Sequence, residues 1–382
     1  MQTRRISIAD LAAAPVIGGG DLLGDGAAVV SPVALVDLDT VDGVTDADLV
    51  RAADRASASD VILVGTSTRM IDDELFPLLD GLDLTYGPHG ADHRAVIGVD
   101  DVEAAIRNFT DAVSRCPQAS LVAAQVVRAA EPLDPVPAID VESLGYSTLQ
   151  GGDEFGRWLQ ERRAKGRPLP PPAVDAVLLD RDGDTLRITL NRPERRNAYG
   201  TALRDALVEA LRLAVLDDSI GHVLVDGAGS SFCAGGDLDE FGHMPDATTA
   251  HLIRTRGGAG RLVAALADRV EVRLHGHCVG AGIEIPAFAG RVVAAPDTRI
   301  RLPEVSMGLI PGAGGTVSVP RRIGRWRALH LFVTGVEIDA AQALAWGVGR
   351  RDRFLSSTNP PLFGISTPFA DGGNAEKGWI CG

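Results

Sequence analysis

Apolar and polar positions follow two periods in the second half of the chain. Leu186–Leu190 alternates as a half-buried strand does, and the turn residues Asp182–Asp184 separate it from Ala176–Leu179, which indicates a β-hairpin. Thr201–Leu216 has helical spacing, and Val223–Val225 is typical of a buried strand. The helical apolar positions are Leu203, Leu207, Leu211 and Val215. The pattern predicts a βαβ unit.

The same alternation continues toward the C-terminus. Val270–Leu274 is typical of a strand, and it leads into the glycine-rich Gly276–Gly282 and an apolar helical run. Arg291–Ala295 has the composition of another short strand. We therefore expect an α/β fold for this half of the chain.

The first half opens with a similar pattern. Val33–Leu38 and Asp60–Gly65 are typical of strands, and Asp46–Ala56 between them is typical of a helix. Either an internal duplication or a generic βαβ repeat accounts for this similarity. Val99–Ala130 is then strongly helical in pattern. We expect an α/β, helix-rich N-terminal domain.

A basic and then proline-rich segment, Glu161–Pro172, separates the two halves and is typical of an extended linker. The chain has 382 residues, and two domains are the expectation for this length. The predicted division is an N-terminal domain at 1–160, a linker at 161–173, a second domain at 174–350 and an irregular tail at 351–382.

Composition limits the classes of function. Lys and Arg number 37 and Asp and Glu 51, so the formal charge is 37 − 51 = −14, which argues against non-specific binding to nucleic acid or anionic membrane. No stretch reaches the apolar length of a membrane span, so we expect no membrane insertion. The four cysteines are scattered without CxxC pairing, which favours a reducing cytoplasm over a disulfide framework or zinc site.

Three segments of the second half carry candidate chemistry. Val223–Leu238 is a strand that runs into small residues and an acidic helix start, where either a ligand approaches backbone N–H groups closely or the glycines serve a tight turn. In His275–Ile285, Glu284 is either a catalytic carboxylate or a charge that complements a helix N-terminus. In Leu302–Thr316, Glu304 is either an exposed loop acid or a buried acid whose pKa its apolar neighbours raise, as acid–base catalysis requires.

Other reactive residues in these segments favour structural roles. His275, His277 and Cys278 cluster without a third metal-ligand pattern, so we interpret them as packing residues and expect no metal. Cys233 has no evident activating base nearby.

Taken together, these motifs resemble the crotonase (enoyl-CoA hydratase/isomerase) superfamily over about residues 174–350. The resemblance is carried by Leu190–Ala198, Ser231–Leu238, Gly280–Glu284, and Pro303-Glu304 with Pro311–Thr316. It implies a ββα superhelix, acyl-CoA thioester substrates and an oxyanion hole of two backbone N–H groups. At the matching positions those donors are Gly236 and Ala281, and they would stabilise negative charge as it develops on the thioester oxygen.

The resemblance also implies roles for side chains. Glu304 is then the proton donor and Glu284 the partner that orients water, while residues around the glycine turn would bind the substrate and its CoA. The expected substrate- and CoA-binding residues are Arg195, Arg196, Ala198, Ala234, Gly235, Asp237 and Leu238. No cofactor is expected beyond CoA as part of the substrate, and a homo-oligomer, trimer or hexamer, is expected as partner state.

The chain departs from the family pattern after Gly347. Relatives continue through helices that close the site, whereas residues 354–382 lack helical periodicity. Val141–Arg162 resembles those closing helices, so the first domain is interpreted as a degenerate copy of the same fold. We expect helices from about 100 to 165 to cover the second domain's site, with Arg157, Arg162, Arg163 or Lys165 near CoA phosphates. The alternative is an independent helical subdomain.

The sequence therefore predicts an enoyl-CoA hydratase, a lyase of fatty acid metabolism that adds water reversibly to a 2-enoyl-CoA. Two alternatives stay open at this point. One is another reaction of the same thioester enolate, such as double-bond isomerisation or hydrolysis of a β-dicarbonyl CoA. The other is a non-catalytic partner subunit.

Overall fold

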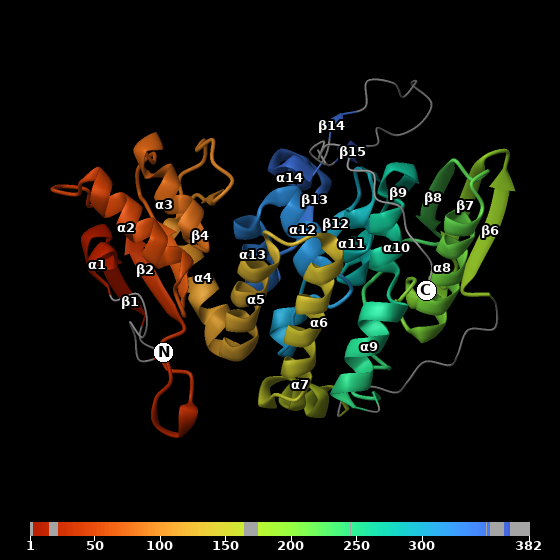
Figure 1. Ribbon diagram of the computed structural model, residues 1–382, viewed down its shortest axis with the longest axis horizontal. Helices are drawn as coiled ribbons and strands as arrows, with labels where there is room; N and C mark the ends of the chain where they lie inside the picture. The colour runs from red at the N-terminus through yellow and green to blue at the C-terminus, as the bar shows by residue number, and fades with distance from the viewer. Residues whose placement is uncertain are drawn as a thin grey trace, which may run out of the picture.

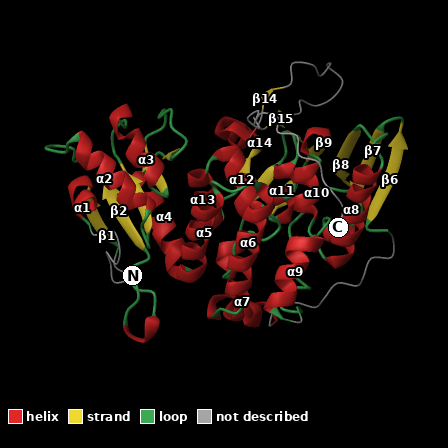
Figure 2. Ribbon diagram, viewed as in Figure 1, coloured by secondary structure: helices red, strands yellow, loops and turns green. Residues whose placement is uncertain are grey.

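The computed structural model describes residues 3–14, 22–163, 175–244, 246–348, 350–351 and 363–366. These residues form a mixed α/β structure in which one sheet lies at each end of the molecule and helices fill the space between them (Figures 1 and 2). A smaller third sheet lies in the second half. No helix in the described part is long and apolar enough to cross a membrane.

The N-terminal sheet has five parallel strands in the order β1-β2-β3-β4-β5. Its elements are β1 (Arg4–Ser7), α1 (Ile8–Ala13), β2 (Val33–Asp37), α2 (Asp46–Ser57), β3 (Ile62–Thr66), α3 (Phe76–Gly81), β4 (Leu84–Gly87) and β5 (Val96–Gly98). The predicted strand–helix–strand opening is thus confirmed as β2, α2 and β3, within one or two residues at each end.

Four helices follow this sheet: α4 (Val102–Arg115), α5 (Pro117–Ala130), α6 (Pro135–Gln150) and α7 (Asp153–Arg163). The helical pattern of 99–130 is therefore two helices, because Pro117 lacks an N–H and moves Cys116 to the non-helical φ −138°, ψ 68°. The predicted linker begins too early, since 161–163 are the last residues of α7. Residues 164–174 lie outside the described part.

These helices do not form an independent subdomain. Helix α5 packs on α12 (Gly315–Ile323) and α13 (Arg325–Thr334), and α6 packs on α9 (Ala247–Gly257), all from the second half of the chain (Figure 1). Gly145 permits the close packing of α6 on α5, because a Cβ there would lie 2.8 Å from Val126 Cγ2.

The large sheet of the second half has the order β14-β15-β11-β9-β8-β7-β6. Its strands are β6 (Val177–Asp182), β7 (Thr185–Leu190), β8 (His222–Gly227), β9 (Val270–Leu274) and β11 (Arg291–Ala294), with the short β14 (Arg350–Arg351) and β15 (Phe363–Ser366). The predicted hairpin is confirmed as the antiparallel pair β6 and β7, and β7, β8, β9 and β11 are parallel. Within the predicted irregular tail, Phe363–Ser366 pairs with β11 instead, and the rest lies outside the described residues.

Helix α8 (Thr201–Leu216) covers this sheet with the predicted bounds. Leu203, Leu207 and Leu211 are buried as expected, but Val215 is exposed. Ala214 takes its place on the buried face, because 3.6 residues per turn bring position 214 into line with 203, 207 and 211.

The small sheet consists of β10 (His277–Val279), β12 (Arg299–Arg301) and β13 (Ile338–Asp339). The apolar helical run predicted after Gly282 is much shorter than expected: α11 spans only Ala281–Glu284. Pro286 cannot donate an intrahelical hydrogen bond, and the chain continues as the 3₁₀ turn Pro286–Phe288. The remaining helices of the half are α10 (Ala259–Ala265) and α14 (Ala340–Ala343).

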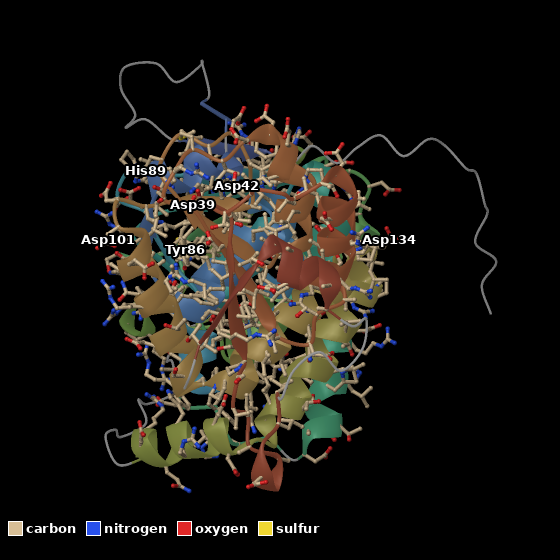
Figure 3. The ribbon with its side chains drawn as sticks, turned by 90° about the vertical axis from the view of Figure 1, so that its left-hand side faces the viewer. Asp39, Asp42, Tyr86, His89, Asp101 and Asp134 are labelled. Atoms are coloured by element: carbon tan, nitrogen blue, oxygen red, sulfur yellow. The ribbon has the colours of Figure 1, made fainter. Side chains whose placement is uncertain are left out.

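One hydrophobic core runs through both halves, from the N-terminal strands to the last helices. Polar contacts reinforce it: the hydroxyl of Tyr86, labelled in Figure 3, lies 2.8 Å from His330 Nδ1. Buried Asp83 accepts from Arg128 Nε at 2.7 Å and lies 3.9 Å from Arg325. The N-terminal half is therefore packed as part of one body, while its origin as a degenerate copy stays a prediction.

Candidate active site

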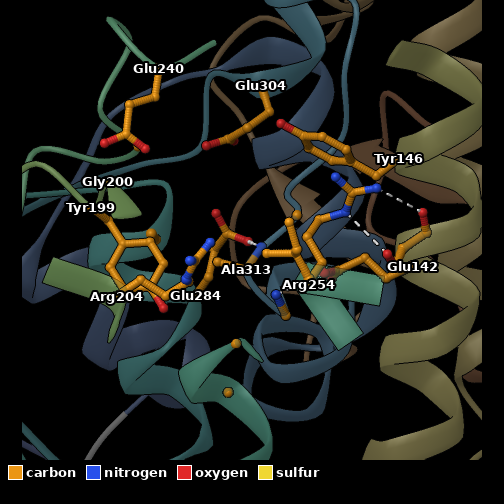
Figure 4. Close-up of a pocket in the computed structure, with 18 of the residues that line it drawn as sticks. Glu142, Tyr146, Tyr199, Gly200, Arg204, Glu240, Arg254, Glu284, Glu304 and Ala313 are labelled. Carbon is orange, nitrogen blue, oxygen red and sulfur yellow. Dashed lines mark hydrogen bonds between the residues drawn. The ribbon is translucent and has the colours of Figure 1, made fainter. Parts of the chain in front are cut away.

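One pocket lies where α6, α9, α11 and the turn after β8 meet (Figure 4). With its open mouth it has about 1210 Å³ of empty space, enough for a sizeable organic ligand. Of the sequence-predicted residues, Gly236, Asp237, Ala281, Glu284 and Glu304 line it. Ile139, Tyr146 and Phe155 line it from α6 and α7, which confirms the prediction that helices between 100 and 165 cover this site.

Two backbone N–H groups face this pocket without a protein acceptor. Tyr199 pairs with the flanking positions, donating to Gly235 O and accepting from the Asp237 amide, so the Gly236 amide points the other way. The Ala281 amide is the first of α11 and has no intrahelical partner. Among the hydrogen bonds of the described residues, neither the Gly236 nor the Ala281 amide is a donor.

Glu284 is held rigidly at the end of α11. Its side chain is 2% exposed, and its Oε2 accepts from the amides of Ala313 at 2.7 Å and Gly315 at 3.0 Å. Burial raises its pKa, the charges of Glu304 and Glu142 raise it further, and the two amides oppose this. The amide of Gly315 is the first of α12, so Glu284 lies at the start of a different helix from its own, and its role as a catalytic carboxylate stays a prediction.

Glu304 begins the 3₁₀ turn Glu304–Met307 after β12. Its Oε2 is buried without a hydrogen-bond partner among the described residues. Burial raises its pKa to about 8; a hydrogen bond from its own backbone N–H opposes this, the charge of Glu142 adds to it, and Arg301 also opposes it. A Cβ on Gly280 would collide with Glu304 Oε1 and lie 3.5 Å from Glu284 Oε1, so the two carboxyl groups meet at this glycine. Glu304 is not an exposed loop acid.

A third glutamate, Glu142, enters the pocket from α6. It is 1% exposed, its Oε1 accepts from the Gly314 amide at 2.8 Å, and its Oε2 accepts from the amide and the hydroxyl of Thr316, both at 2.8 Å. Burial raises its pKa to about 7, and the hydrogen bonds from Thr316 and Gly314 oppose this. Sequence reasoning missed Glu142. The one available signal was its helical register with Ile139 and Tyr146 on an otherwise apolar face.

Ionisation of all three carboxyl groups around one pocket costs free energy, because their negative charges repel one another. Hydrogen bonds distinguish them, because Glu142 and Glu284 accept backbone N–H groups that stabilise their ionised forms, whereas Glu304 Oε2 accepts none. Burial raises the pKa of all three carboxyl groups, so each can hold a proton near neutral pH, and the role of Glu304 as the proton donor stays a prediction.

The second half of the chain is similar to known proteins. The family model described as enoyl-CoA hydratase/isomerase matches residues 181–352. The 2,3-dehydroadipyl-CoA hydratase of Escherichia coli is 35% identical over 175 residues, which cover 46% of this chain and 68% of that protein. The chain belongs to the enoyl-CoA hydratase/isomerase family. Within this family, the 1,2-epoxyphenylacetyl-CoA isomerase of E. coli is 34% identical over 180 residues, 46% of this chain and 68% of that protein.

Solved structures of the family include an enoyl-CoA hydratase of Mycobacterium smegmatis, 31% identical, which covers 45% of this chain and 67% of its own with a TM-score of 0.42. The enoyl-CoA hydratase/isomerase match begins at residue 181, so α4–α7 lie outside it. Glu142 is therefore contributed by a part of the chain that the family model does not match.

Most of the residues that the family resemblance assigns to CoA binding do not line the pocket. Arg195 lies 2.7 Å from Asp237 and 3.4 Å from Asp239, so its charge is compensated within the protein. Arg196 is exposed in the left-handed region at φ 49°. Of the seven predicted residues only Asp237 lines the pocket. Arg195, Arg196 and Ala198 lie in the segment after β7, and Ala234, Gly235 and Leu238 lie in the segment after β8.

The basic residues predicted near CoA phosphates either pair within the protein, do not line the pocket or lie outside the described residues. Arg162 pairs with Asp239 at 2.9 Å. The side chain of Arg163 and all of Lys165 lie outside the described residues. Arg157 is exposed on α7 and does not line the pocket.

The reactive residues interpreted as structural divide into two groups. Cys233 is buried and burial raises its pKa to about 12, while Cys278 is fully buried. His275 is half-buried, but His277 is exposed, so its interpretation as a packing residue is wrong. Within the described residues no cluster of three or more His, Cys, Asp or Glu could hold a metal.

Proposed function

We propose that this protein catalyses the reversible hydration of a 2-enoyl-CoA thioester. The observation that carries the proposal is the presence of Glu284 and Glu304 in one pocket with two uncommitted amides, those of Gly236 and Ala281. Negative charge that develops on the thioester oxygen would be stabilised by these amides, which need no reorganisation during the reaction.

In the proposed reaction, Glu284 accepts a proton from water as the water oxygen bonds to the β-carbon. The π electrons of the double bond move toward the thioester, and Glu304 delivers its proton to the α-carbon. Over the whole reaction, one O–H bond of water and the π bond break, and one C–O and one C–H bond form. Proton transfer from Glu284 to Glu304 resets the site. The reaction has no net redox change, so we expect no cofactor beyond the CoA of the substrate.

The proposal is tested with purified protein and 2-enoyl-CoA thioesters of increasing chain length. Hydration removes the ultraviolet absorbance of the conjugated thioester. We expect this loss in wild type and a decrease in kcat of about 100-fold or more in Glu284→Gln and Glu304→Gln. Glu209→Gln, on the exposed face of α8, is the control and keeps wild-type rates.

Unchanged activity in both active-site variants would show that these glutamates are not the acid–base pair. Gain of conjugated absorbance with a 3-enoyl-CoA, without hydration of 2-enoyl-CoA, would assign isomerisation instead. No reaction with any thioester would favour a non-catalytic partner subunit. Homo-oligomerisation, cytoplasmic location and a place in fatty acid metabolism remain part of the proposal.

A further inference from the structure

Two glutamates from opposite halves of the chain bind alternate amides of one loop. Glu284 Oε2 accepts from residues 313 and 315, and the Glu142 carboxylate accepts from residues 314 and 316. Figure 4 shows Glu284 and Glu142 reaching the loop at Ala313 from different sides. The segment Ala313–Thr316, which consists of the two residues before α12 and the first two residues of that helix, thus lies between the two carboxylates. We call this segment the Ala313–Thr316 loop.

We propose that Glu142 is a positioning residue of this active site: it holds the Ala313–Thr316 loop in place, so that the loop amides fix the Glu284 carboxylate toward the reacting water. The inference rests on the proposed hydration, since it concerns the orientation of the water-binding glutamate. It also assigns a part in catalysis to α6, which precedes the residues that match the family.

The loop is rich in glycine, so its own residues restrict its backbone conformation little, and contacts from outside are needed to hold it in place. Residues 312, 314 and 315 are glycine, and Gly314 has φ 102°, a conformation that other residues rarely adopt. Glycine loses more conformational freedom on ordering than other residues. Glu142 supplies three hydrogen bonds to this loop. A displacement of about 1 Å at a catalytic group can reduce a rate by 100-fold.

The charges around Glu142 give the proposal an electrostatic signature. Tyr146 lies on α6 itself, and Arg254 faces Glu142 from α9, where it favours the ionised carboxylate. Glu284 of α11 and Glu304 of the 3₁₀ turn face it across the pocket, and Arg301 acts on Glu304. The negative charge of Glu142 raises the pKa of both Glu284 and Glu304.

The decisive variant is Glu142→Gln in the full-length protein, assayed by 2-enoyl-CoA hydration. Gln places an N–H₂ group where the loop amides need an acceptor, so we expect kcat to fall about tenfold or more while KM changes less than about threefold. Loss of the negative charge lowers the pKa of Glu284 and of Glu304. Both limbs of the bell-shaped pH profile should therefore move to lower pH, by roughly half a unit or more.

Two companion variants separate position from charge and from folding. Glu142→Asp keeps the charge but shortens the reach, so it should lose kcat with a smaller change of pH profile. Glu154→Gln is the matched control: Glu154 of α7 is also buried and accepts two amides, from Gln118 at 2.8 Å and Ala119 at 3.0 Å, but it does not line the pocket. Its loss should lower the melting temperature and leave the pH profile unchanged.

Hydrogen exchange of the segment 312–318, followed by mass spectrometry, reports on the loop independently of the reaction. We expect faster exchange in Glu142→Gln than in wild type or Glu154→Gln. Unchanged exchange, or wild-type kcat with an unmoved pH profile, would overturn the proposal, as would an equal shift in Glu154→Gln. If Glu142→Gln does not fold, wild-type kcat in Glu142→Asp overturns it. An inactive wild type contradicts the proposed function alone, since exchange still tests the loop.

Discussion

Glu142, Glu284 and Glu304 are the same side chain in three different states of hydrogen bonding. The first accepts three hydrogen bonds, the second accepts two, and Glu304 has a buried oxygen that accepts none among the described residues. At the residue scale, this difference supports the roles that we propose for the three glutamates. A buried carboxyl oxygen without a donor disfavours the ionised form, although the Glu304 carboxyl group also accepts from its own backbone N–H. A protonated carboxyl group is the one that can act as an acid.

The raised pKa of Glu304 predicts a pH-dependent cost in stability. Its ordinary pKa is 4.5 and its pKa in the folded protein is about 8. Below pH 4.5 the group is neutral in both the folded and the unfolded state and costs no stability. As pH rises toward 8, the unfolded state ionises first, so the free energy of unfolding decreases. Glu304→Gln carries no charge at any pH. The melting temperature of this variant should exceed that of wild type by a margin that grows between pH 5 and 8, reaching several degrees, and then levels.

Thermal unfolding followed by circular dichroism at several pH values measures this margin. A margin that is constant with pH would show that Glu304 has no perturbed pKa in the folded protein. Glu209→Gln, on an exposed residue, should show no such trend.

At the scale of elements, the pocket is closed by the pairing of α6 with α9. Arg254 of α9 donates from Nε to Ser143 Oγ at 3.1 Å and from Nη1 to Gln150 Oε1 at 3.1 Å, and its guanidinium lies 4.4 Å from the centre of the Tyr146 ring. Ser147 Oγ accepts from the same group. A single planar cation thus joins one turn of α9 to four side chains of α6.

Replacement of Arg254 by Lys keeps the charge but removes the planar group that reaches several acceptors at once. We expect Arg254→Lys to lower the free energy of unfolding by about 1 to 3 kcal/mol, measured by urea denaturation. Arg256 is exposed two residues later on α9. Arg256→Lys should change the free energy of unfolding by less than about 0.5 kcal/mol. Equal stability of the two variants would show that the contacts of Arg254 do not hold the helices together.

Local patterns predict the elements of this fold well and their assembly poorly. The hairpin, α8 and the parallel strands depend on turn residues and spacing within a few positions, so the sequence indicates them. The break at Cys116 and the short α11 depend on single prolines inside apolar runs, which periodicity passes over. The motif residues Gly236, Ala281, Glu284 and Glu304 are predicted together. Glu142 is not, because its partner Gly314 is 172 positions away.

At the scale of the whole molecule, the two halves share one core, and the helices of residues 102–163 supply part of the pocket's lining. A fragment that begins at residue 173 would expose the faces of α12 and α13 that α5 covers, and it would lack Glu142. We expect this fragment to be insoluble or without hydration activity. Full activity in the isolated fragment, assayed as for wild type, would show that the first half is dispensable.

The amides that Glu284 and Glu142 accept include the first two of α12, those of Gly315 and Thr316. The N-terminus of a helix favours negative charge, so this helix start stabilises the ionised form of both glutamates. A residue inserted between Pro311 and Gly315 would move the start of α12 relative to both carboxylates at once.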